Sequence, residues 1–312
     1  MVQPDVTIED MSSWLTDETL DWVAKHIGIY QTEALKKVRF ALVHRYVSGS
    51  SLVGSDEDQE SDKLVRILIE LLHIIRPMRQ NTSIVRAESS ENGTRRVIHF
   101  ETPHEIEVPE VQKLYHVRDK DLILLRSLAP VFTGAMSGNA EKFRSAVFYH
   151  SVGRAVGHGN ATYLLWCSSI EALFTSHNRD HQGKLVATER IKWFLGATTP
   201  IYEPGDIPSF VSPQPSINVG DVVDKLYDVR NYIAYGDVIP KEFFENGMRQ
   251  GVAGDVATIE VLSEAASFIV RESLLRILKN NLLIHFESAT SAEAYFAEPG
   301  LTKSLLSKIH KR

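Results

Sequence analysis

Leu226-Tyr-Asp-Val-Arg-Asn-Tyr-Ile-Ala-Tyr-Gly236 is the stretch of this sequence from which its fold can be worked out. Apolar residues around it repeat at intervals of four, three and four: Val222, Leu226, Val229 and Ile233. This spacing predicts a helix with one buried face, and Asp221 is placed to cap its start. Near the other end two readings stay open. Either the helix continues as far as Tyr235, or Arg230 and Asn231 cap it by meeting the last carbonyls and forming the turn.

Further helices are expected on both sides of this stretch. Their predicted ranges are 141–156, a segment that begins near Asn160, 183–195, and 256–283. A proline-rich loop separates the third helix from Asp221, and residues 133–139, with two glycines, form a linker or sharp corner. We therefore place one domain over residues 139–290, after a front domain of residues 1–138 and before a tail of residues 291–312 that contains a short helix.

The front domain is predicted to be mostly helical. Apolar spacing predicts helices from Asp17 through Leu42 and Val43, over residues 64–75 before Pro77, and over Leu122–Phe132. Between residues 83 and 101 the pattern changes to alternation around a turn at Asn92-Gly93, which predicts a small β-hairpin. The fold class is thus mainly α: a C-terminal helical bundle preceded by a mostly helical N-terminal domain with a small hairpin.

Composition excludes several classes of protein. With 43% hydrophobic and 24% charged residues the chain can bury a core, while its formal net charge of -6 argues against coating nucleic acid by overall attraction. Cys167 is the only cysteine, so no intramolecular disulfide or cysteine-rich zinc site can form. Residues 1–10 lack the basic and apolar run of a signal peptide, and the most apolar stretches are too short and too charged to span a membrane. We expect a cytoplasmic protein without a membrane contact.

Three motifs in the second half occur in a recognisable order. A helix ends in Ser169-Ile-Glu-Ala-Leu-Phe174, Lys184-Leu185 opens the next helix, and Leu226-Tyr-Asp-Val-Arg-Asn follows, with a glycine five residues later. The arrangement resembles the Apea-like branch of the HEPN superfamily. There, a Leu-Glu-Ala-Leu-Phe-like helix is followed by Tyr, two spacers, Arg-Ser or Arg-Asn, and His-Gly. The resemblance covers nearly half of the chain and leaves the front domain without a family.

The resemblance implies an all-α HEPN-like bundle that often pairs as a homodimer, with the Arg and His motifs of two subunits meeting in a cleft. Many members are metal-independent RNA endonucleases of toxin-antitoxin or antiviral defence systems, and others have lost catalysis and bind RNA or protein partners. The expected partners are therefore RNA, a second copy of the chain, and an antitoxin or another protein. The motif implies a site built from Arg230, Asn231 and Tyr235, with Glu171 orienting Arg230.

The sequence departs from the family pattern at Tyr235, where histidine is expected before the glycine. Cleaving RNA without a metal requires a proton acceptor, a proton donor and a fixed cation for the phosphorane charge. Arg230 supplies a permanent cation that forks onto phosphate oxygens. A phenol replaces an imidazole poorly, because its ordinary pKa of about 10 leaves about one group in a thousand ionised at pH 7. A hydrogen bond to phosphate or stacking on a base survives the change, so the sequence predicts RNA binding with weak or absent cleavage.

Two alternative functions stay open. An active metal-independent endoribonuclease would need His177 or His181, or a partner subunit, to replace the missing imidazole. A non-catalytic dimerisation or protein-interaction module would use the motif helix only as an interface. Lys184, Arg190 and Lys192 are candidates for flanking an RNA path, although basic residues on a helix more often form a solvated face. No zinc-protease helix, phosphate loop or nucleophile elbow occurs, so we expect neither a metal nor another cofactor.

Overall fold

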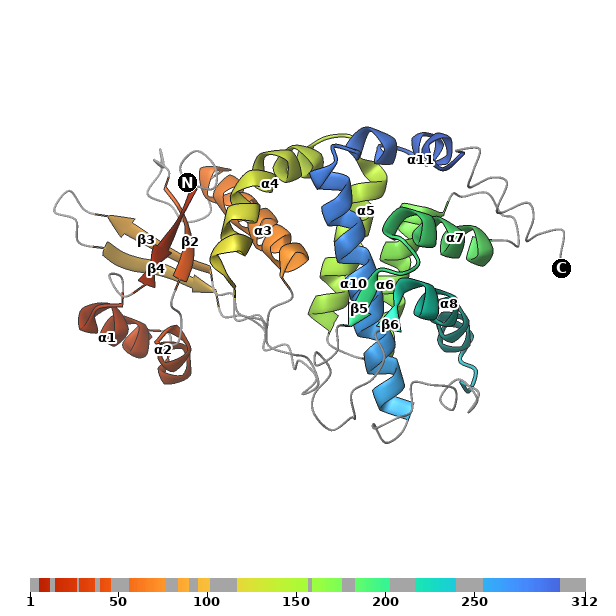
Figure 1. Cartoon of the computed structure of the whole chain (residues 1–312). Coiled ribbons are helices and arrows are strands. Elements are labelled where there is room, and N and C mark those ends of the chain that lie inside the picture. The colour runs from red at the N-terminus through yellow and green to blue at the C-terminus, as the bar shows by residue number, and fades with distance from the viewer. Residues whose placement is uncertain are drawn as a thin grey trace, which may run out of the picture. The chain divides into compact units, whose positions relative to one another are not determined.

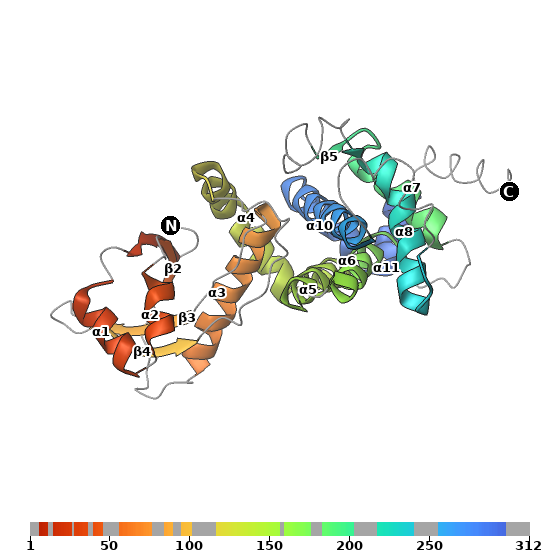
Figure 2. The same cartoon turned by 90° about the horizontal axis from the view of Figure 1, so that it is seen from below.

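The structure is a computed structural model in which the chain forms two compact units (Figures 1 and 2). The first unit consists of residues 1–106 and 114–133, and the second of residues 107–113 and 134–312. The fold is mainly helical, as the sequence predicts. The structure describes residues 6–11, 15–26, 28–36, 40–45, 56–76, 84–89, 95–101, 117–156, 159–175, 183–202, 217–239 and 255–297.

The first unit contains a two-stranded antiparallel sheet that the sequence does not predict. Strand β1 (Val6–Asp10) pairs with β2 (Phe40–His44), with helices α1 (Asp17–His26) and α2 (Ile29–Leu35) between them along the chain. Leu42 and Val43 lie opposite Ile8 and Thr7 in this sheet, so their predicted helical assignment is wrong. A pairing partner more than thirty residues earlier decides the conformation of this segment, and the local spacing of apolar residues does not report it.

A second sheet confirms the predicted hairpin near residues 83–101. Strand β3 (Ile84–Ser89) pairs antiparallel with β4 (Arg95–Glu101). The pairing register shifts between Arg86 and Ala87, which adds an irregularity to one strand of the ladder.

Two long helices supply much of the apolar core of the first unit. Helix α3 (Asp56–Ile75) buries Leu68, Leu71 and Ile74, which confirms the predicted helix before Pro77. Helix α4 (Asp119–Ser137) buries Leu125 and Phe132.

Helix α4 is longer than predicted, because residues 133–137 continue the helix and the corner is confined to Gly138 and Asn139. The hydroxyl of Thr133 donates to the carbonyl of Ala129 at 2.8 Å, within the helix. A Cβ at position 138 would lie 2.9 Å from the carbonyl oxygen of Gly134, so the chain leaves the helix at a residue that must be small.

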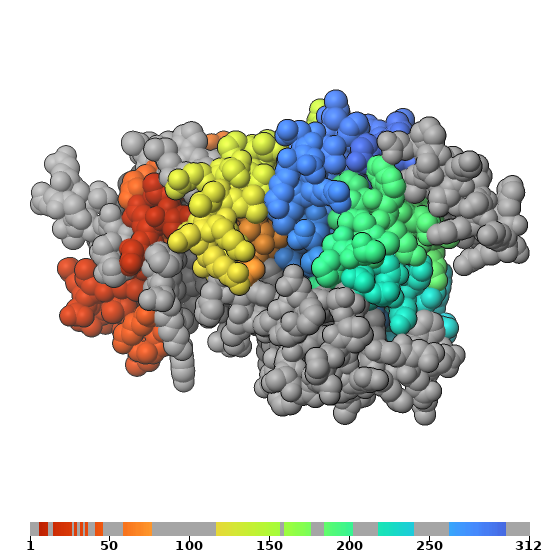
Figure 3. All heavy atoms as spheres, viewed as in Figure 1, coloured from red at the N-terminus to blue at the C-terminus, as the bar shows by residue number. Residues whose placement is uncertain are grey.

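The second unit is a bundle of helices. Its helices are α5 (Glu141–Val156), α6 (Gly159–Phe174), α7 (Gly183–Leu195), α8 (Val219–Tyr235), α10 (Asp255–Lys279), the 3-10 turn η2 (Leu283–Phe286) and α11 (Ala289–Phe296). Helices α5, α6 and α10 run side by side, and α7 and α8 form a pair against them (Figures 1 and 2). Figure 3 shows α10, α7 and α8 as neighbouring surfaces on one face of this unit. Within the described residues, no helix is both long and apolar enough to cross a lipid bilayer.

Helices α5 and α6 pack closely at the centre of the bundle. Three α6 side chains donate to α5 carbonyls: Thr162 to Gly153 at 3.0 Å, Trp166 to His150 at 3.2 Å, and Ser169 to Ala146 at 2.6 Å. The Trp166 ring lies directly against Gly153, where a Cβ would come within 2.7 Å of Nε1. This contact favours glycine at position 153 and restricts the rotation of α6, the helix that carries Glu171.

Helix α8 is defined at both ends. It follows strand β6 (Ile217–Asn218), which pairs with β5 (Pro200–Tyr202). The carboxylate of Asp221 caps the first turn of the helix by accepting a hydrogen bond from the N–H of Asn218 at 2.9 Å. Asp221 thus acts from inside the helix and not from in front of it. At the other end Gly236 adopts a left-handed φ of 73°. Its N–H donates to Ile233 at 3.2 Å and that of Asp237 donates to Tyr232 at 2.8 Å, the bonds of a Schellman cap.

Candidate functional site

Arg230 and Glu171 come together from α8 and α6. Nη2 of Arg230 lies 3.2 Å from each oxygen of the Glu171 carboxylate. The arginine side chain keeps 29% of its surface exposed and the glutamate side chain 28%. The ion pair expected between these residues is therefore present, and it holds the guanidinium at the surface of the bundle without burying it.

Asn231 lies beside the guanidinium. Nη1 of Arg230 donates to Oδ1 of Asn231 at 3.2 Å. A guanidinium has five N–H donors, so the contacts with Glu171 and Asn231 leave donors that a further acceptor can use. The alternative in which Arg230 and Asn231 cap the helix is wrong, because α8 continues to Tyr235 and Gly236 forms the cap.

Tyr235, the residue that stands where the motif has histidine, is the last residue of α8 and is 77% exposed. Tyr227, two turns earlier, is buried in the bundle wall. The alternative that both tyrosines are wall residues is therefore right for Tyr227 and wrong for Tyr235. Arg230 and Tyr235 are five residues apart, which is about 7.5 Å along a helix axis. An exposed phenol and a partly exposed cation thus share one end of α8.

A buried polar cluster lies beneath the ion pair. Tyr163 of α6 donates to the carbonyl of Leu226 at 2.5 Å, and burial raises its pKa well above 10. Burial raises the pKa of Cys167 to about 12, with Glu171 adding to the rise. Burial and then Glu171 likewise raise the pKa of Tyr227 well above 10. These groups stay neutral near pH 7, so Cys167 is a poor nucleophile.

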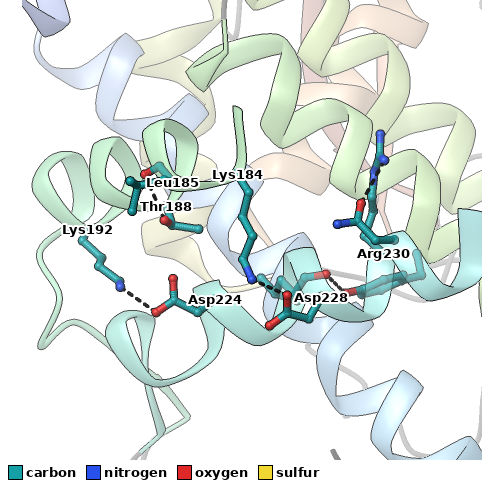
Figure 4. Close-up of polar contacts among 10 residues, drawn as sticks. Lys184, Leu185, Thr188, Lys192, Asp224, Asp228 and Arg230 are labelled. Atoms are coloured by element: carbon teal, nitrogen blue, oxygen red, sulfur yellow. Dashed lines mark hydrogen bonds and ion pairs between the residues drawn. The ribbon is translucent and has the colours of Figure 1, made fainter. Parts of the chain in front are cut away.

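Lys184 lies in the same region but its charge is compensated. Its amine pairs with the carboxylate of Asp228, two positions before Arg230, and its side chain is one third exposed (Figure 4). About two turns further along α7 and one turn earlier on α8, Lys192 donates to Asp224 at 2.9 Å, so two ion pairs join α7 to α8 (Figure 4). Lys184 therefore adds little net positive charge near Arg230. The sequence order gives no sign of these partners, because they become neighbours only when α7 packs on α8.

Arg190 does not belong to this surface. Its side chain is 7% exposed and pairs with Glu293 of α11 through two hydrogen bonds of 2.8 and 2.6 Å. A buried cation held in this way cannot flank an exposed RNA path, so we remove Arg190 from the candidate site. His177 and His181 lie outside the described residues.

Comparisons with models of protein families, with curated proteins and with solved structures find no match to this chain. The part of the chain that the structure describes contains no group of three or more His, Cys, Asp or Glu side chains placed to hold a metal ion. The site is thus described by its own geometry: a cation oriented by a carboxylate, an amide beside it, and an exposed phenol at the end of the same helix.

Proposed function

We propose that the second unit is an HEPN-type RNA-binding domain that contacts RNA through Arg230, Asn231 and Tyr235, and that it cleaves RNA weakly or not at all. The observation that carries the proposal is the guanidinium of Arg230, which Glu171 orients at 3.2 Å while 29% of its side chain stays exposed. Tyr235, at the end of the same helix, is also exposed. The proposal retains the resemblance to the Apea-like family, and an active metal-independent endoribonuclease remains the alternative.

Phosphate is the chemical group that fits the exposed part of Arg230. Guanidinium is permanently charged and presents a planar fork to phosphate oxygens. The ion pair with Glu171 restricts the side chain before binding, which lowers the conformational entropy lost when a phosphate arrives. The same carboxylate cancels part of the charge, and the whole chain carries a formal charge of -6. Binding should therefore be modest and should weaken with salt.

Tyr235 fits a nucleobase. Its ring is exposed at the end of α8, five residues after Arg230, which is about 7.5 Å along the helix axis and about 140° around it. Stacking of a base on an aromatic ring contributes about 1 to 3 kcal/mol and tolerates any base. A single strand with a phosphate on Arg230 and a base on Tyr235 would therefore have to pass around the end of α8, and it would bind there without strong sequence preference.

Weak cleavage follows from the same pair of residues. Arg230 can stabilise negative charge on a phosphate, but a phenol supplies a poor general base near pH 7. Removing a well-matched acid or base costs about 100-fold to 10,000-fold in rate. Under this proposal the setting is a cytoplasmic toxin-antitoxin or antiviral defence system, with an antitoxin or another protein as a further partner.

The test is RNA binding by the full chain. Fluorescence anisotropy with a labelled single-stranded RNA of mixed sequence should show binding at low salt. Arg230→Gln should lower the affinity at least tenfold, while Arg126→Gln, a change of the same charge at an exposed residue of α4, should leave it within about twofold. Absence of binding at low salt rejects the proposal. Robust cleavage of the RNA in the presence of a chelator rejects the proposal that Tyr235 leaves the site with weak or no cleavage, and it favours the active endoribonuclease.

A second candidate is a homodimer or protein interface at the same end of α8. Val238 is 89% exposed directly after the helix cap, so that it and Tyr235 place two large apolar side chains on the surface. If these two side chains form one contiguous apolar patch, it would suit a protein contact. Sedimentation velocity of the wild type and of Val238→Ser separates this candidate: a dimer that the substitution dissociates supports it, and a monomer at all concentrations rejects it.

A further inference from the structure

The C-terminal end of α6 receives two cations from other helices. The last carbonyls of a helix have no partner within the helix and carry partial negative charge. Nη1 of Arg190, on α7, donates to the carbonyl of Phe174 at 3.0 Å. Nζ of Lys142, on α5, donates to the carbonyl of Thr175 at 2.6 Å. Both cations cap the turn of α6 that contains Glu171.

Helix α11 supplies the counter-charge. The carboxylate of Glu293 accepts two hydrogen bonds from Arg190, and the ring of Phe296 lies 5.0 Å from the guanidinium carbon. Because a buried cation needs a partner, Arg190 can occupy this position only while α11 is docked. Phe296 also packs against Phe174 and Phe194, with ring centroids 5.8 and 6.3 Å away.

The protonation of Lys142 depends on the same carboxylate. The pKa of its amine is lowered to about 8, chiefly by burial; Glu293 opposes this shift, Arg190 adds to it, and Glu141 opposes it. Removing the charge of Glu293 would leave the charges of Arg190 and Lys142 less well compensated, with the smaller influence of Glu141 still acting on Lys142. The hydrogen bonds of Arg190 and Lys142 to the last carbonyls of α6 would then both weaken.

The capped turn is directly connected to the candidate site. The N–H and the hydroxyl of Thr175 both donate to the carbonyl of Glu171, at 3.0 and 2.7 Å. The side chain of Glu171 is the one that lies 3.2 Å from Arg230. A connection therefore runs from Glu293 through Arg190 to the carbonyl of Phe174, along the backbone to Thr175, by hydrogen bonds to the carbonyl of Glu171, and from its side chain to Arg230.

We infer that Arg190 is a positioning residue, which transmits the docking of α11 to Glu171 and so sets the place of the Arg230 guanidinium. The part of this inference that concerns RNA affinity rests on the proposed function. The part that concerns the position of Arg230 does not. The same Arg190 that the sequence suggests as an RNA contact thus acts on RNA only through Glu171.

Glu293→Gln is the decisive variant, because it removes the charge and keeps the shape. Glu287→Gln is its matched control, an exposed glutamate between η2 and α11. The readout is the guanidinium NMR signal of Arg230, assigned by its loss in Arg230→Gln, at a temperature at which all variants are folded. The signal should shift in Glu293→Gln and in Glu171→Gln, stay in place in Glu287→Gln, and return toward its original position in Glu293→Asp.

Hydrogen exchange gives a second readout. Amides of the last turn of α6, including that of Thr175, should exchange at least tenfold faster in Glu293→Gln than in the control, while those at the centre of α10 should not change. If Glu293→Gln lowers Tm but leaves the Arg230 signal in place, the substitution only destabilises the protein, and the inference is overturned. Unchanged exchange at Thr175 overturns it as well.

RNA affinity then tests the functional consequence. Glu293→Gln should weaken RNA binding at least threefold, and it should have no further effect in a protein that already carries Arg230→Gln, because both substitutions act on the same contact. Additive effects of the two substitutions contradict transmission through Arg190. If the wild type binds no RNA, the proposed function fails, while the NMR signal of Arg230 still decides the positioning role.

Discussion

Gly153→Ala should destabilise the second unit, because the surface of α5 at this position is filled by the Trp166 ring of α6. An ideal Cβ at position 153 would lie 2.7 Å from Nε1 and 2.8 Å from Cδ1 of that ring, and 3.3 Å from the Cβ of Leu165. Real Cβ atoms do not approach other atoms so closely, so the ring has to move. Its hydrogen bond to the carbonyl of His150, now 3.2 Å long, would then lengthen or break.

Three terms set the size of the effect. Overpacking of a core costs about 1 to 3 kcal/mol. Loss of the indole hydrogen bond costs about 1 kcal/mol more. In the other direction, alanine is better than glycine in a helix interior by about 1 kcal/mol. The free energy of unfolding should therefore fall by about 1 to 3 kcal/mol, which lowers Tm by roughly 2 to 12 °C for a unit of this size.

Differential scanning calorimetry and urea denaturation of the full chain measure this change. Gly134→Ala is the matched control, since a Cβ at this helical position meets no described atom within 4 Å apart from the neighbouring backbone of its own helix. The control should leave the protein unchanged or raise its stability by up to about 1 kcal/mol. If Gly153→Ala proved as stable as the wild type, the close packing of α5 against α6 would be refuted, and with it the fixed orientation of the helix that carries Glu171.

The buried hydroxyls and the buried histidine of the second unit give two more predictions. Tyr163→Phe removes the 2.5 Å hydrogen bond to Leu226 and should cost about 1 kcal/mol, whereas Tyr227→Phe should cost nothing, because among the described residues the Tyr227 hydroxyl is buried without a partner. Equal losses in urea denaturation would contradict this assignment. Burial, reinforced by two nearby arginines, lowers the pKa of His150 well below 6.5. The unfolded chain therefore takes up a proton that the folded chain does not as pH falls below about 6.5, and stability should fall by at most about 1.4 kcal/mol per pH unit. His150→Asn should remove this part of the pH dependence, and an unchanged slope between pH 6.5 and 5 would count against a neutral, buried imidazole.

The helices of the second unit were predictable because their signals are local. Helices α5 and α7 have the predicted bounds, Glu141–Val156 and Gly183–Leu195, since glycines mark where each helix ends or begins. Strand β2 was not predictable in this way. Residues 40–44 become a strand by pairing with β1, and a short apolar segment is compatible with either structure until that partner is known.

In the candidate site, too, contacts within the motif were predictable from the sequence and contacts with distant segments were not. The pairing of Glu171 with Arg230 was expected from the resemblance, because both residues belong to its motif, and the structure brings them together. The burial of Arg190 could not be expected from the sequence, because the carboxylate that neutralises it, Glu293, comes 103 residues later. A basic residue on a helix gives the same sequence pattern whether it faces solvent or a distant helix that folds over it.

The salt dependence of RNA affinity tests the central claim most directly, namely that the guanidinium of Arg230 neutralises a phosphate. The logarithm of the association constant for single-stranded RNA should fall linearly with the logarithm of salt concentration, and the slope should be smaller in Arg230→Gln by about 0.7 for the one phosphate contact removed. A slope that is identical in the wild type and in Arg230→Gln, or an affinity that salt does not change, would contradict the account.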